Sequence, residues 1–117
     1  MSTKITQQRI QKAEKQIDAL RGKLKAFELV CSGTLMRRML TCGNQACVCR
    51  KNAASRHGPY YYWGRRKGGR LVQMLLTPAE AAVIRRAISN YRAVRVVLRR
   101  WEEETVKIVE ARRTLQT

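Results

Sequence analysis

Acidic residues are scarce in this 117-residue sequence, which has 8 aspartates and glutamates against 25 lysines and arginines. Residues 29–79 contain none. The middle of the chain therefore lacks a carboxylate that could act as a general base or bind magnesium. It also has no Ser/His/Asp grouping and no phosphate-binding glycine loop. These absences predict that the protein is not an enzyme.

Long apolar runs are missing as well. No run approaches the roughly 18 residues that a transmembrane helix needs, and the polar N-terminus lacks the apolar core of a signal peptide. We therefore expect a cytoplasmic protein that is not associated with a membrane. Thiols stay reduced in that compartment, so the 4 cysteines are expected to bind metal rather than to form disulfides.

Positive charge is abundant, and the net charge of +17 predicts a polyanionic partner. In the acid-free stretch, basic residues gather near the cysteines and at a glycine turn, with aromatic residues between them. This combination suits phosphates together with stacked bases. The predicted nucleic-acid-binding residues are Arg37, Arg38, Arg50, Lys51, Arg56, Arg65, Arg66, Lys67 and Arg70.

The aromatic run at residues 60–63 is predicted to lie on a strand, where alternate side chains face opposite ways. One pair is therefore expected to pack in the core, and Tyr60 and Tyr62 are assigned to contacts with nucleic acid. DNA is expected ahead of RNA, because a two-stranded ribbon with a basic tip can enter the major groove. The sequence indicates no preference for particular bases.

Three cysteines and the only histidine lie close together with the spacing C-x4-C-x-C-x7-H. These residues are Cys42, Cys47, Cys49 and His57, a complete tetrahedral ligand set for a structural zinc ion. A disulfide between Cys47 and Cys49 is disfavoured, because one intervening residue forces strained geometry. Three alternatives stay open: an iron–sulfur cluster with Cys31 in place of His57, unmetallated thiols, and a Cys49/His57 nucleophile.

Four segments carry a family resemblance. They begin at Gly33, Cys42, His57 and Thr77, and they read G-T-L-M-R-R, C-G-N-Q-A-C-V-C, H-G-P-Y-Y-Y-W and T-P-A-E. The chain thereby resembles a family of small bacterial proteins that is catalogued as a domain of unknown function and is often encoded near transposases and other mobile elements. The resemblance spans roughly residues 33–92 and leaves Cys31 outside the pattern. It implies a zinc-knuckle-like fold and a mobile-element context, but no reaction.

Apolar residues at alternating spacings of three and four predict two long helices. The first runs from about Thr3 to Leu29, and the second begins with a capping box at Thr77–Glu80 and continues to about Thr114. Between them, strands are predicted at residues 34–41, 60–66 and 71–76, the last two joined by a Gly-Gly turn. The predicted seams are Ile10, Ala13, Ile17, Leu20, Leu24 and Phe27 in the first helix, and Ile84, Ala87, Tyr91, Val94, Leu98, Trp101, Thr105, Ile108 and Leu115 in the second. The apolar face of the second helix is expected to be widened by Val83, Ile88, Val96 and Val97.

These elements predict an α+β fold, in which a small zinc-clipped antiparallel β-hairpin or sheet is flanked by two helices that pair as an antiparallel coiled coil. The expected division is a helix at 1–30, a zinc-binding β module at 31–77 and a long helix at 78–117, all in one folding unit. Because the second helix is the longer, its distal end near Trp101 and Ile108 is expected to be left uncovered. That end would then either bind a second copy or a partner helix, or fold back or fray.

The combined features predict a nucleic-acid-binding zinc protein that acts as a DNA-binding accessory or regulatory protein of a mobile genetic element. The alternative is a coiled-coil adaptor that recruits a partner protein such as a transposase.

Overall fold

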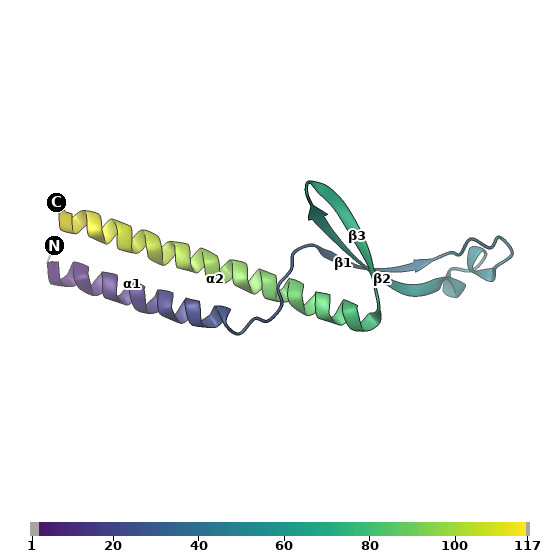
Figure 1. Cartoon of the computed structure of the whole chain (residues 1–117), viewed down its shortest axis with the longest axis horizontal. Coiled ribbons are helices and arrows are strands. Elements are labelled where there is room, and N and C mark those ends of the chain that lie inside the picture. Colours follow the sequence, from purple (N-terminus) through teal and green to yellow (C-terminus); the bar gives the residue numbers. More distant parts are fainter. Residues whose placement is uncertain (1–2, 117) are drawn as a thin grey trace. The chain divides into compact units, whose positions relative to one another are not determined.

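The structure, a computed structural model, describes residues 3–116 and has the α+β architecture that the sequence predicts. Helix α1 (Thr3–Leu24) is followed by strand β1 (Thr34–Leu40), two short 3-10 turns, strands β2 (His57–Lys67) and β3 (Arg70–Leu76), and the long helix α2 (Pro78–Gln116) (Figure 1). Residues 1, 2 and 117, which the predicted ranges 1–30 and 78–117 include, lie outside the described residues.

Contacts divide the chain into two compact units. One contains the chain up to Leu29 together with the part of α2 from Asn90 onward, and the other is Val30–Ser89. Helix α2 belongs to both, because its first three turns pack with the sheet and the remainder packs with α1. Folding of the whole chain as one unit stays a prediction.

The sheet of the second unit is antiparallel, with the strand order β1-β2-β3. Strands β2 and β3 form a tight hairpin in which Lys67 is opposite Arg70. The two turn residues, Gly68 and Gly69, have positive φ angles of 57° and 79°, a conformation that glycine adopts without steric cost and that two-residue hairpin turns require. The predicted Gly-Gly turn is therefore confirmed.

The core of the second unit lies between one face of the sheet and the start of α2. Trp63 and Leu76 from the sheet pack with Ala81 and Ile88 from α2, and all four are buried. The indole N–H of Trp63 donates a 2.8 Å hydrogen bond to the carbonyl of Ser32, which satisfies the one polar atom of a buried tryptophan. Because alternate side chains share a face, the core-facing aromatic pair is Trp63 and Tyr61.

Helix α2 begins at the predicted capping box. The hydroxyl of Thr77 accepts a hydrogen bond from the backbone N–H of Glu80 at 3.1 Å, and the Glu80 carboxylate accepts one from the backbone N–H of Thr77 at 2.9 Å. The Thr77 backbone and side-chain hydrogen bonds lower the pKa of Glu80. Two of the amides that a helix start leaves unpaired are thus satisfied locally, so the boundary between the sheet and α2 is set by four residues.

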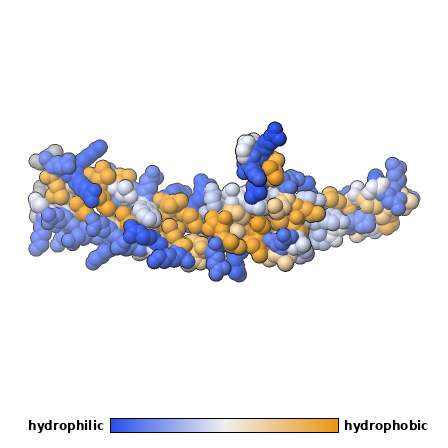
Figure 2. Space-filling model, in the orientation of Figure 1, coloured by the Kyte–Doolittle hydropathy of each residue, from blue (hydrophilic) through white to orange (hydrophobic). Residues whose placement is uncertain are grey.

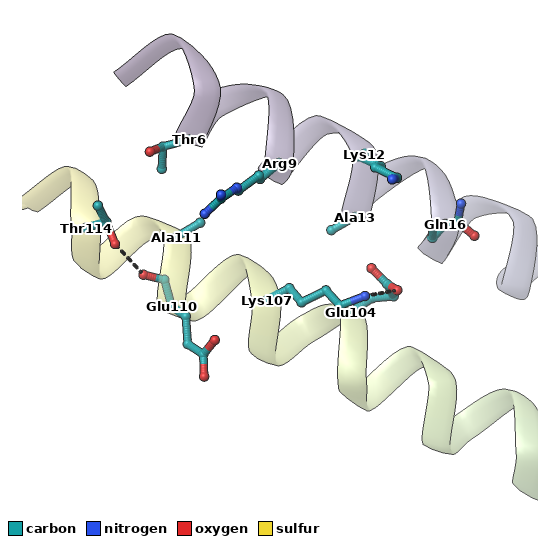
Figure 3. Close-up of a pocket in the computed structure, with 10 residues that line it drawn as sticks. All are labelled: Thr6, Arg9, Lys12, Ala13, Gln16, Glu104, Lys107, Glu110, Ala111 and Thr114. Atoms are coloured by element: carbon teal, nitrogen blue, oxygen red, sulfur yellow. Dashed lines mark hydrogen bonds and ion pairs between the residues drawn. The ribbon is translucent and has the colours of Figure 1, made fainter. Parts of the chain in front are cut away.

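In the other unit, α1 and α2 run in opposite directions (Figures 1 and 3). The Arg21 guanidinium lies 5.5 Å from the centre of the Trp101 ring, and the Asn90 side-chain amide donates to the carbonyl of Leu29 at 2.9 Å. The end of α2 lies beside the start of α1, where Ala13 and Ala111 line the same cleft (Figure 3). The expectation that the distal part of α2 is uncovered near Trp101 and Ile108 is wrong, because both side chains are partly buried.

A cleft of about 550 Å³ lies between the first half of α1 and the last part of α2 (Figure 3). Small side chains at Ala13 and Ala111 form part of its wall. The charged groups around it have both signs, as in the 2.9 Å ion pair between Lys107 and Glu104. Three cations and two carboxylates line the cleft, so it lacks the charge of a single sign that would mark a site for a charged ligand.

The buried face of α2 differs from the predicted seam. Leu98 is 51% exposed and Thr105 is exposed, whereas Val97 and Ala111 are buried at 6% and 9%. Of the residues predicted to widen the seam, Ile88 and Val97 are buried, whereas Val83 and Val96 are exposed. The helix presents one face to the sheet, around Ile88, and a different face to α1, so a single seam cannot describe both.

Within residues 3–116, neither helix has the unbroken apolar length that crossing a bilayer requires.

Candidate metal centre and basic surface

The four predicted metal ligands lie at one end of the β1–β2 pair. Residues 41–56 form a long loop between these strands; we call it the ligand loop. Cys42 follows the end of β1 by two residues, and His57 is the first residue of β2. Leu40 pairs with His57 across the ladder, after an irregularity in register between Arg38 and Leu40. The sheet therefore holds both ends of the loop together and brings the first and last ligands to the same place.

The ligand atoms converge. The three sulfurs and the His57 ring nitrogen all lie within 4.8 Å of one another. The Sγ atoms of Cys42 and Cys49 are 3.6 Å apart, and Cys47 Sγ is 3.4 Å from His57 Nε2. Around a tetrahedral zinc ion with Zn–S bonds of about 2.3 Å and Zn–N bonds of about 2.0 Å, two sulfurs lie ~3.8 Å apart and a sulfur and a nitrogen ~3.5 Å apart. The cluster thus has the dimensions of a single-ion site.

The same distances decide between the chemical alternatives. A disulfide needs sulfurs about 2.05 Å apart, and all four cysteines are free. Cys31 is not in the cluster. It packs beside the core, and its backbone N–H donates a hydrogen bond to the backbone carbonyl of Ala87. Burial raises the pKa of the Cys31 thiol, against the opposing charge of Arg65. The fourth ligand of the cluster is therefore His57, and a four-cysteine iron–sulfur set is not assembled.

The pKa values of Cys47 and Cys49 are shifted in opposite directions within the cluster. Hydrogen bonding by the backbone N–H of Cys49, with further side-chain hydrogen bonds led by His57, lowers the pKa of Cys47 to about 6. At Cys49 the backbone N–H of Cys42 acts to lower the pKa, but burial and the neighbouring thiols outweigh it and raise the pKa. Three sulfurs this close repel one another as thiolates, and a bound dication is what would remove that repulsion.

Short turns fold the ligand loop around the cluster. The side-chain oxygen of Asn44 accepts a hydrogen bond from the backbone N–H of Ala46 at 3.0 Å. The backbone carbonyl of Asn44 accepts one from the backbone N–H of Cys47 at 3.1 Å. A 3-10 turn at Val48–Arg50 then places Cys49 inside, where it is only 2% exposed. Asn44 therefore sets the direction in which Cys47 enters the site, as asparagine does in turns generally.

Gly58, directly after His57, allows the chain to pass close to β1. Its φ angle is 131°, and a side-chain Cβ at this position would come within 2.8 Å of the Arg38 carbonyl oxygen. A residue with a side chain would be strained here both by the positive φ angle and by the close approach of its Cβ to the carbonyl oxygen. The position of His57 at the start of β2 thus depends on the glycine that follows it.

Arg50 braces the ligand loop from outside the cluster. Its guanidinium donates to the carbonyl of Cys42 at 2.9 Å and to the carbonyl of Asn44 at 3.4 Å. The sequence predicts Arg50 as a contact to nucleic acid, but the side chain is already engaged with two backbone carbonyls beside the first ligand. Arg50 is therefore a positioning residue for the metal site in this structure.

We expect Arg50→Ala to weaken metal binding by roughly 10- to 100-fold, the usual cost of losing an outer-shell partner. Arg50→Lys should restore little of this loss, because an ammonium group cannot span the two carbonyls as a planar guanidinium does. Lys51→Ala is the matched control, since it removes a neighbouring exposed charge. Competition with a chromogenic chelator measures the affinities. Equal losses in Arg50→Ala and Lys51→Ala would show that Arg50 contributes only charge.

The other predicted basic residues are almost all exposed. Arg65 is half buried, with its guanidinium 4.4 Å from the centre of the Trp63 ring. Arg38 lies 5.4 Å from the centre of the Tyr62 ring, and Arg66 donates to the carbonyl of Gly69 at 3.4 Å. Figure 2 shows the tip of the β2–β3 hairpin as hydrophilic. The remaining cations, all exposed, are Arg37, Lys51, Arg56, Lys67 and Arg70.

Sequence reasoning missed the structural roles of Arg50 and Asn44. Asn44 had a usable signal, because asparagine two residues after a cysteine in a glycine-containing loop favours a turn. Arg50 had none, because a sequence does not distinguish a cation that binds backbone carbonyls from one that faces solvent.

Comparisons with known proteins identify a family and nothing closer. No curated protein and no solved structure matches the chain. A family described as a domain of unknown function (DUF6788) matches residues 3–86. The match includes α1, which the resemblance at residues 33–92 left out, together with the sheet and the ligand loop. Because this match covers most of the chain, the chain belongs to the DUF6788 family.

Proposed function

We propose that this protein binds nucleic acid and that a structural zinc ion maintains the shape of its binding unit. The observation that carries the proposal is the charge distribution around the metal cluster. From residue 29 to residue 79 the chain has no acidic side chain, and the unit Val30–Ser89 contains Glu80 as its only acidic residue. A solvated surface normally mixes the two signs of charge.

Zinc is proposed as the ion because of the ligand types. Three thiolates and one imidazole favour zinc over magnesium, calcium or manganese, which prefer oxygen. Four protein ligands fill a tetrahedral shell and leave no open position for a reacting water, so the role is structural. The small size of the unit supports the same conclusion, because small folds commonly need a metal to supplement a limited core.

Nucleic acid is proposed as the polyanion because of the aromatic residues among the cations. Tyr60, at 38% exposure, and Tyr62 stand on the side of β2 that does not carry the Trp63 core. Tyr60 is exposed and Tyr62 is partly exposed, and such rings beside arginines suit bases as well as phosphates. A membrane surface would demand a broad apolar helix face instead.

The biological context and the compartment are proposed on separate grounds. A DNA-binding accessory or regulatory role in a mobile genetic element follows only from the family resemblance noted from the sequence. A reducing cytoplasmic setting is proposed because the four cysteines are free thiols and three of them converge as ligands.

The test neutralises charge at the hairpin tip. We expect the double variant Arg66→Gln/Lys67→Gln to bind labelled nucleic acid more weakly and to lower the slope of log affinity against log salt by about 2, one for each phosphate contact. The control Arg112→Gln/Arg113→Gln removes the same charge from the exposed end of α2 and should change little. Fluorescence anisotropy measures both. If the two variants bind alike, net charge and not the proposed surface governs binding.

An adaptor role is the second candidate, and one observation favours it. On the part of α2 that packs with α1, Leu98, Val106 and Val109 are 51%, 47% and 46% exposed. These apolar side chains lie on one side of the helix, away from the buried Val97 and Ala111. A partner protein that covered them would remain bound at salt concentrations that release nucleic acid.

A further inference from the structure

We propose that the open face of the sheet is a stacking platform for single-stranded nucleic acid. The inference rests on the proposed function and names the form of nucleic acid that it takes. The platform consists of Met36, Arg38, Tyr60, Tyr62, Leu71 and Leu75, with Gly64 at its centre.

Strand register assigns these residues to one face. In an antiparallel sheet, directly opposite residues project to the same side. Tyr62 is opposite Met36 on β1 and Leu75 on β3, and Tyr60 is opposite Arg38. Tyr60 and Tyr62 therefore lie on the same face of the central strand. Tyr62 has an edge strand on each side, whereas Tyr60 has β1 on one side and lies beyond the end of β3.

Gly64 has no side chain, so the side chains of its neighbours cover it on this face. A Cβ at that position would lie 3.2 Å from the Met36 methyl carbon and 3.9 Å from a methyl carbon of Leu71. Met36 and Leu71 thus fill the space over the glycine and extend the apolar surface beyond the two tyrosines. Aromatic and aliphatic side chains therefore lie on all three strands of this face, with the polar Gln73 between Leu71 and Leu75 on β3.

No element of the second unit covers this face. Helix α2 packs on the opposite side, against Trp63 and Leu76. On the open side, Leu71 is 64% exposed and Leu75 is 59% exposed. Such exposure of large apolar side chains in one patch marks a binding surface.

The positive charge beside the platform indicates which kind of ligand it binds. Arg38 borders Tyr62, and Arg66 is one step further along the same face of β2. Acidic side chains are absent from all three strands. An unpaired strand offers both exposed bases for the tyrosines and phosphates for the arginines. In a duplex the bases stack on each other, so their faces cannot reach a sheet surface of this kind.

The experiment compares a labelled thymidine oligonucleotide with a blunt duplex of the same length, using fluorescence anisotropy at one salt concentration. We expect the protein to bind the single strand more tightly. Tyr60→Leu and Tyr62→Leu should each weaken single-strand binding roughly tenfold, and the double variant roughly a hundredfold. Duplex binding should change far less. The corresponding Phe variants keep the rings and should bind like the wild type.

Tyr91→Leu is the control, because it makes the same chemical change on α2, outside the platform. Metal content and tryptophan fluorescence verify that each variant is folded. Equal losses for single strand and duplex, or no loss in the Leu variants, would overturn the platform. A protein that bound only duplex would also overturn it while leaving nucleic-acid binding intact. Failure to bind either form at low salt would contradict the proposed function itself.

Discussion

Replacement of Cys49 by serine is expected to abolish zinc binding and to unfold the ligand loop, whereas replacement of Cys31 by serine is expected to preserve both. Cys49 is the most buried cysteine, at 2% exposure, and its sulfur lies 3.6 Å from that of Cys42. A serine hydroxyl is not a thiolate and does not replace one as a zinc ligand. Cys31 lies outside the cluster, so its sulfur is not needed.

The size of the effect follows from the coupling between metal binding and folding. Structural zinc commonly contributes about 10–16 kcal/mol of apparent binding free energy in small zinc domains at neutral pH. Loss of one ligand should therefore leave the loop without metal at any zinc concentration found in ordinary buffers. Far-ultraviolet circular dichroism should change little, because α1 and most of α2 belong to the other unit.

Metal analysis of purified protein and proteolysis of the loop measure this prediction. The wild type and Cys31→Ser should each retain zinc and resist cleavage at residues 41–56. Cys49→Ser should contain none and be cleaved there, giving the same pattern as wild type treated with chelator. Zinc retained in Cys49→Ser, or zinc lost in Cys31→Ser, would show that the ligand set is assigned wrongly.

Affinity for nucleic acid is expected to fall on the order of a thousandfold between 50 and 200 mM salt. The figure corresponds to about six phosphate contacts on duplex DNA, since each releases a condensed counterion. Six is fewer than the exposed cations among residues 29–79. The expected affinity loss is large because neighbouring acidic groups do not offset these charges.

The measurement is a titration of labelled DNA at several salt concentrations, plotted as log affinity against log salt. A straight line with a slope near −5 is the expected result. A flat response would mean that phosphate contacts do not carry binding. If a partner protein stays attached at salt concentrations that release nucleic acid, the adaptor role is favoured and the exposed side chains Leu98, Val106 and Val109 become the surface to change.

Local signals in the sequence predicted much of the sheet and of the metal cluster. The capping box at Thr77–Glu80 and the Gly68-Gly69 turn were predicted from residues that lie within a few positions of one another. The same holds for the cluster from Cys42 to His57. Each feature is settled by backbone preferences and short-range chemistry, and distant parts of the chain have little influence on it.

Features that depend on packing were predicted less well. Helix α1 ends at Leu24 and not at Leu29, because its last turn tightens through three hydrogen bonds, such as that from Lys25 N to the Gly22 carbonyl at 3.3 Å. The apolar spacing continues past this point, since Phe27 is still partly buried. Periodicity alone therefore placed the helix end too late.

The buried face of α2 was predicted only in part, for a related reason. Ile88 faces the sheet and Val97 is buried in the other unit, and the two positions do not belong to a single seam. A sequence shows that both residues are apolar but not which partner each one meets. Prediction of Leu98 as a buried residue followed from treating the helix as having one partner along its whole length.

The most direct test of the central claim is X-ray absorption at the zinc edge on purified wild-type protein. We predict one zinc ion per chain, coordinated by three sulfurs at about 2.3 Å and one nitrogen at about 2.0–2.1 Å. A folded protein without metal, or an ion coordinated by four sulfurs or by oxygen, would contradict the account.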